Sequence, residues 1–124
     1  MYSNGYNIYK SNSVNYASKE QLLLMLVDGA VKFTKIGRQA IIDKDNQKSH
    51  DSLKRVQDIF VELMSTLDQT AGDWAEKLFS VYEYIKGKLF EANIKKDVTI
   101  IDEVLPLIEN IRDTWNEAYK IAKR

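Results

Sequence analysis

The clearest helical pattern in the chain runs from Trp74 to Asp97, WAEKLFSVYEYIKGKLFEANIKKD. Apolar side chains recur in it at alternating steps of three and four residues, which places them on one face of an α-helix. This row consists of Ala75, Leu78, Tyr82, Ile85, Leu89 and Ala92. A second row at Phe79 and Phe90 makes the apolar face wider than one helix contact needs. The stretch therefore predicts a bundle helix that has two neighbours or keeps hydrophobic surface for another contact.

A long helix is predicted before this stretch, over residues 18–43. Ser18 followed by Gln21 is the pattern of a capping box, which marks a helix start. Apolar residues then cover about half of the helix circumference, so two neighbouring helices can pack on it. Gly29 and Gly37 are unfavourable within a helix, by up to about 1 kcal/mol each, and we interpret them as points where another backbone approaches closely.

Two further helices are predicted, over residues 46–67 and 98–122. Asp73 is expected to cap the helix that follows Gly72, and Asp97 the last helix. Pro106 lies inside the last helix and is expected to bend it. Connections this short require neighbouring helices to be antiparallel. The prediction is an all-α, up-and-down four-helix bundle.

The N-terminal segment, residues 1–17, is rich in Ser, Asn and Tyr, a composition typical of a disordered tail. Tyr6 and Tyr9 nevertheless share a face if the segment is helical, and an extended stretch begins at Val14. The alternative to a disordered tail is a short helical and extended cap that docks in a groove. The chain is thus divided into a cap segment, 1–17, and a bundle, 18–124.

Composition excludes several classes of function. The 124 residues carry 18 basic and 18 acidic side chains, so no charge excess favours nucleic acid or an anionic membrane. The chain has no cysteine, which excludes disulfides and thiol chemistry. No signal-peptide pattern and no apolar run of about 18 residues occur, so we expect a cytoplasmic protein without membrane insertion.

No motif for catalysis, a cofactor or a metal is found. The one histidine, His50, lacks the paired Glu-x-x-His motifs of a di-metal bundle. His50 with Leu53 and Lys54 approximates the His-x-Leu-Lys-Gly pattern of histidine phosphotransfer bundles, but the spacing is one residue too long and the glycine is missing. The sequence contains no P-loop motif for phosphate binding and no glycine-rich turn for dinucleotide binding. A non-enzymatic role without cofactors is expected.

Surplus hydrophobicity is the remaining signal. Met25, Val27, Phe79 and Phe90 lie at the flanks of the predicted core stripes. They either broaden the core or line outer grooves, and a protein that exposes several such residues usually has a partner for them. A groove for an amphipathic helix and a homodimer interface are the two alternatives.

Specific strings resemble one known family, the flagellar secretion chaperones FliS. They occur in family order over nearly the whole chain: Tyr6-x-x-Tyr9, Val14, Ala17-Ser18, Leu22-x-x-Met25-Leu26-Val27-Asp28-Gly29-Ala30, Glu62-Leu63-x-x-x-Leu67-Asp68, Gly72, Val81-Tyr82-x-Tyr84, Ala92-Asn93-x-x-x-Asp97 and Arg112-Asp113-x-Trp115. The chain departs from the family pattern at Lys19, Val27 and Val81.

The resemblance implies a cytoplasmic chaperone that binds the disordered C-terminal segment of flagellin and delivers it to the flagellar type III export gate. From their matching family position and helical spacing, we also predict that in the free protein Tyr6 and Tyr9 occupy part of the surface that binds flagellin, and that they shift when flagellin binds. A generic helical adaptor that forms a weak homodimer is the rival hypothesis. The candidate partner-binding residues are Tyr6, Tyr9, Val14, Leu22, Met25, Val27, Phe79 and Phe90.

Overall fold

The computed structural model describes residues 18–122, which contain four α-helices and one 3₁₀ turn and no strand. The elements are α2 (Lys19–Ile42), α3 (Asn46–Thr66), η1 (Gln69–Ala71), α4 (Asp73–Lys95) and α5 (Val98–Ala122). The predicted cap segment, with Tyr6, Tyr9 and Val14, lies outside the described residues.

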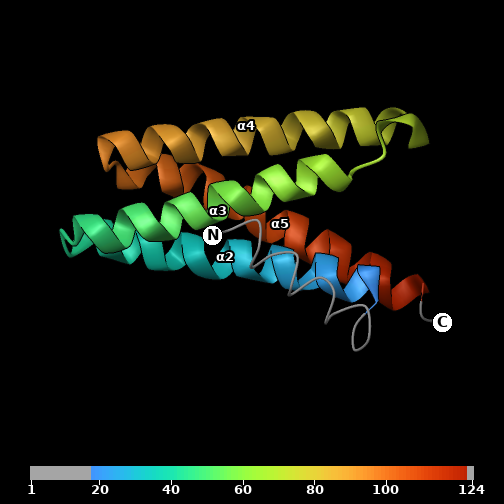
Figure 1. Ribbon diagram of the computed structural model, residues 1–124, viewed down its shortest axis with the longest axis horizontal. Helices are drawn as coiled ribbons and strands as arrows, with labels where there is room; N and C mark the ends of the chain where they lie inside the picture. The colour runs from blue at the N-terminus through green and yellow to red at the C-terminus, as the bar shows by residue number, and fades with distance from the viewer. Residues whose placement is uncertain (1–17, 123–124) are drawn as a thin grey trace.

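The four helices lie side by side, and successive helices run in opposite directions (Figure 1). α2 packs against α3 and α5, and α4 packs against the same two helices. The helices therefore form a ring in chain order, in which the last helix returns to the first. The predicted antiparallel four-helix bundle is confirmed. Within residues 18–122, no helix has an apolar stretch long enough to cross a lipid bilayer.

Local polar groups start two of the helices as predicted. The side chain of Ser18 accepts the backbone N–H of Gln21 at 3.2 Å, and the Gln21 side chain accepts the N–H of Ser18 at 2.9 Å. Asp97 accepts the backbone N–H of Thr99 at 2.9 Å and its hydroxyl at 2.6 Å. These bonds satisfy backbone donors that a helix start leaves free.

The start of α4 differs from the prediction. Asp73 is the first residue of the helix, and Gly72 is the capping residue, without a side-chain bond. The backbone of Gly72 has φ 144°, a conformation that favours glycine, so the chain turns into α4 through backbone geometry. The prediction that Asp73 caps this helix is wrong.

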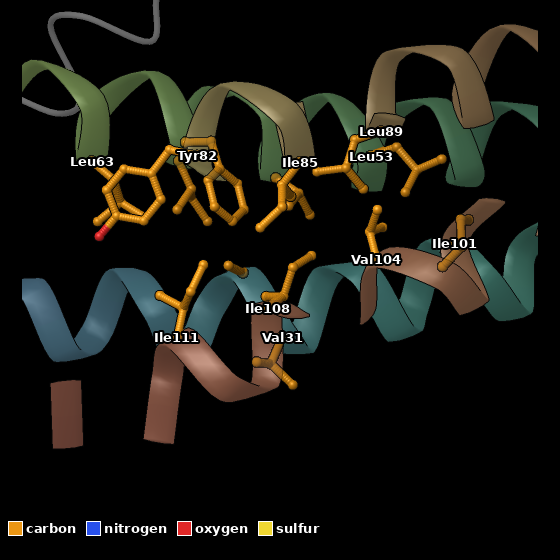
Figure 2. Close-up of a cluster of buried hydrophobic side chains, with 14 of the residues drawn as sticks. Val31, Leu53, Leu63, Tyr82, Ile85, Leu89, Ile101, Val104, Ile108 and Ile111 are labelled. Atoms are coloured by element: carbon orange, nitrogen blue, oxygen red, sulfur yellow. The ribbon is translucent and has the colours of Figure 1, made fainter. Parts of the chain in front are cut away.

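The core runs along the length of the bundle. Side chains from α3 and α4 point toward those from α2 and α5 (Figure 2). Tyr82 and Leu89 belong to it, as the α4 stripe predicts, and the ring of Phe60 meets Tyr82 edge to face. Other fully buried side chains include Leu53, Leu63, Ile85, Ile101 and Ile108.

The buried face of α2 includes a polar side chain. Val27, Val31 and Thr34 are buried, and the Thr34 hydroxyl donates to the carbonyl of Ala30 at 2.7 Å. This bond explains how a polar side chain fits in the core. At Gly37 a β-carbon would lie 2.7 Å from the side chain of Leu53, so the close neighbour is a side chain of α3 and not the expected backbone; at Gly29 the nearest atom, on Ile59, lies at an ordinary contact distance of 3.5 Å.

Candidate functional site

An open groove of about 770 Å³ lies between α4 and α5 within the described part of the chain, and we call it the α4/α5 groove. None of its ten lining residues carries a charge. They are Trp74, Leu78 and Val81 from α4, and Pro106, Leu107, Asn110, Ile111, Thr114, Trp115 and Ala118 from α5.

The α4 wall follows from the spacing of its three residues. Trp74, Leu78 and Val81 are four and three apart, so they stack on one side of the helix. Leu78 packs against the core, whereas Trp74 is 54% exposed and Val81 is 39% exposed. A β-carbon on Gly72 would lie 3.2 Å from the Trp74 ring, so glycine at this turn leaves room for the indole.

The α5 wall combines large and small side chains. From Pro106 to Ala118 it extends about 18 Å, at about 1.5 Å per residue. Small residues, Thr114 and Ala118, alternate with the larger Leu107 and Trp115, which leaves space along the wall. α5 continues through Pro106 without interruption, and the bend predicted there stays a prediction.

A hydrogen bond joins this wall to the core. The indole N–H of Trp115 donates to the hydroxyl of Tyr82 at 3.0 Å. Burial raises the pKa of the Tyr82 phenol, and the bond from Trp115 lowers it by a smaller amount. The phenol therefore stays neutral at physiological pH.

Charged groups lie outside the lining of the groove. Arg38 on α2 donates to Asp102 on α5 at 2.6 Å, and this bond lowers the pKa of the Asp102 carboxyl. The Tyr84 hydroxyl donates to Glu103 at 2.8 Å, which raises the pKa of the tyrosine. Within residues 18–122, no three histidine, aspartate or glutamate side chains gather closely enough to hold a metal ion. An uncharged apolar groove suits the apolar face of a helix.

A smaller cavity of about 240 Å³ lies between α2 and α3 and is lined by Phe33, Asp51, Ser52 and Arg55. The guanidinium of Arg55 lies 4.6 Å from the centre of the Phe33 ring. Opposite charges share this cavity, and it is less than a third of the size of the α4/α5 groove. We therefore place the candidate site in the larger groove.

His50, the residue behind the phosphotransfer alternative, is exposed near the start of α3. Its Nδ1 lies 3.1 Å from the side-chain nitrogen of Asn93 on α4, and Lys96 donates to the Asn93 oxygen at 2.7 Å. If the amide nitrogen donates, Nδ1 accepts, and the histidine proton is on Nε2. Asn93 therefore ties α4 to α3.

Five of the predicted partner-binding residues lie within the described part of the chain, three on α2 and two on α4. Val27 is 1% exposed and belongs to the core, so the prediction that it lines a groove is wrong. Leu22 and Met25 lie on α2, which packs against α3 and α5, and Met25 is 51% exposed. The contact of Leu22 and Met25 with a partner stays a prediction.

Phe79 and Phe90 share one side of α4, because eleven residues make about three turns. Phe90 is exposed and lies one turn before Asn93, which bonds to α3, so this side faces α3. Neither phenylalanine lines the α4/α5 groove. The sequence therefore indicated surplus apolar residues on α4, but it did not identify Trp74 and Val81 as residues that line a groove. Their spacing with Leu78 was the available signal.

Comparisons with known proteins agree with this architecture. The sequence model of the family described as "Flagellar protein FliS" matches residues 2–122. The protein named flagellar secretion chaperone FliS from Bacillus subtilis (strain 168) is 33% identical over 121 residues, which cover 98% of this chain and 90% of the relative. The protein of that name from Escherichia coli (strain K12) is 31% identical over 109 residues, covering 86% and 80%.

A solved structure described as "Crystal structure of flagellar chaperone from bacteria" has the same fold, with a TM-score of 0.75 at 16% identity. The match covers 97% of this chain and 98% of that chain. With the family match over nearly all residues, the conclusion is that this chain belongs to the flagellar secretion chaperone FliS family.

Proposed function

We propose that this protein is a cytoplasmic export chaperone that binds the disordered C-terminal segment of flagellin. In this role it prevents premature polymerisation of flagellin and delivers it to an export gate component of the flagellar type III secretion apparatus. Membership of the FliS family supports the proposal, since relatives carry the name flagellar secretion chaperone. Their names also support a non-enzymatic role.

The observation that carries the proposal is the α4/α5 groove. Its α5 wall is long enough for about three turns of an α-helix. Because its lining is uncharged, the complementary partner is an amphipathic helix with an apolar face. Each large apolar side chain that becomes buried contributes about 1.5–3 kcal/mol, which offsets the cost of ordering a disordered segment.

Two matched substitutions test where the segment binds. Val81 lies on the groove wall and Val61 lies on α3 outside it, with exposures of 39% and 47%. Val81→Asp places a charge against the partner's apolar face, where an unpaired charge is unfavourable. We expect at least tenfold weaker binding of a fluorescent flagellin C-terminal peptide, about 1.4 kcal/mol, and no change for Val61→Asp.

The reverse pattern, weaker binding by Val61→Asp alone, would place the site on the α3 side of α4 and refute the groove assignment. No binding by the unmodified chain would refute the flagellin proposal. If the protein has the mass of a dimer and does not bind the peptide, the homodimeric adaptor is supported instead. Light scattering after size-exclusion chromatography measures that mass.

A further inference from the structure

Trp115 is the one groove residue whose side chain is hydrogen-bonded to the core. Its ring forms part of the groove wall, and its N–H donates to the hydroxyl of Tyr82 at 3.0 Å. Tyr82 is 1% exposed and sits among the core side chains, as Figure 2 shows. It is not a lining residue, so it acts on the groove through Trp115.

The Tyr82 ring is itself held from a third helix. Its centre lies 5.7 Å from that of Phe60 on α3, with the planes at 66°, an edge-to-face arrangement. Contacts therefore run from Phe60 through Tyr82 to Trp115, across α3, α4 and α5. A tyrosine fixed by close packing offers its oxygen at a fixed position.

We propose that Tyr82 is a positioning residue for partner binding: its hydroxyl holds the Trp115 indole in the groove wall and accepts the N–H that an apolar partner cannot accept. The inference rests on the proposed function of the groove. An indole N–H buried without an acceptor is unfavourable. Because the Tyr82 hydroxyl accepts this N–H, an apolar helix can exclude water from the groove wall without leaving the N–H unpaired.

This arrangement specifies part of the partner. The residue that docks against Trp115 needs no carbonyl or hydroxyl to accept the indole N–H, so an aliphatic or aromatic side chain is favoured there. Asn110 and Thr114 are the other lining residues with polar side chains. The bound helix therefore presents its apolar anchors to Trp115 and its polar atoms toward these two residues.

Tyr82→Phe tests the inference, because it removes the hydroxyl and keeps the ring that packs on Phe60. Tyr84→Phe is the matched control: Tyr84 lies on the same helix, its hydroxyl donates to Glu103, and it does not line the groove. Three quantities are measured: the affinity for the flagellin C-terminal peptide, the indole N–H resonance of Trp115 and the thermal unfolding midpoint of the free protein. Trp74→Phe assigns the resonance.

We expect Tyr82→Phe to weaken peptide binding about tenfold, to shift the Trp115 resonance and to speed its hydrogen exchange. Tyr84→Phe should change neither the affinity nor the resonance. A purely structural role for Tyr82 would lower the unfolding midpoint and leave the affinity of the folded protein unchanged, which would overturn the inference. An unchanged Trp115 resonance would also overturn it.

A double-mutant comparison separates the effect of the Tyr82 hydroxyl on Trp115 from a general effect on folding. Trp115→Phe removes the N–H and keeps an apolar ring, so adding Tyr82→Phe to it should cause no further loss of affinity. A full additional loss would contradict the inference. If the unmodified protein binds no peptide, the proposed function fails, and the Trp115 resonance alone decides whether Tyr82 positions the indole.

Discussion

Replacing Gly37 by alanine should destabilise the bundle, although alanine is the better helix former. A β-carbon at this buried position on α2 would lie 2.7 Å from Cδ2 and 2.9 Å from Cγ of Leu53. Leu53 is 0% exposed, so its side chain has no open space to enter. Alanine gains about 1 kcal/mol in helix propensity, and overpacking costs about 1–3 kcal/mol. The free energy of unfolding should therefore fall by about 0–2 kcal/mol.

Gly87→Ala on α4 is the matched control, because a β-carbon there meets nothing within 4 Å. This variant gains the propensity alone and should be more stable by about 1 kcal/mol. Urea unfolding followed by circular dichroism measures both variants. Leu53→Ala removes the clashing atoms, so in that background Gly37→Ala should no longer be costly. Equal stabilisation by Gly37→Ala and Gly87→Ala in the unmodified protein would refute the close approach.

Two other predictions concern the core and the response to acid. Leu89→Ala should lower the free energy of unfolding by about 2–5 kcal/mol, and the neighbouring exposed Phe90→Ala should change it by less than about 0.5 kcal/mol; similar losses in urea unfolding would contradict the assigned burial. The hydrogen bonds from the Thr99 hydroxyl and backbone N–H lower the pKa of Asp97. Its ionised form therefore contributes stability that is present above the unfolded pKa of about 3.9 and is lost as pH falls through the lower folded value. Asp97→Asn keeps a capping group without this titration, so its urea midpoint should fall less than that of the unmodified protein below about pH 4; parallel falls would count against the bond.

The helices could be predicted from sequence because their signals are local. The capping box at Ser18 and the cap at Asp97 involve residues two or three positions apart, and the stripe around Tyr82 and Leu89 has a clear period. The start of α4 could not be predicted in the same way. A conformation with φ 144° at Gly72 replaces the side-chain cap, and the pattern Gly-Asp fits either residue as the cap.

The buried face of α2 and the α4/α5 groove depend on contacts between helices. Six successive apolar residues from Leu22 to Val27 give no period, so the sequence alone could not show that Val27 is buried and Met25 exposed. The groove is lined from both α4 and α5, and the packing of these two helices against each other is not a local property of the sequence. Excess apolar residues predicted a binding surface without locating it.

We propose above all that the α4/α5 groove binds the C-terminal segment of flagellin. Isothermal titration of the protein with a peptide of about forty C-terminal flagellin residues, repeated at several temperatures, tests it most directly. We expect a one-to-one complex with a strongly negative heat-capacity change, and a loss of most binding in Val81→Asp. An absence of binding, or an identical titration with Val81→Asp, would contradict it.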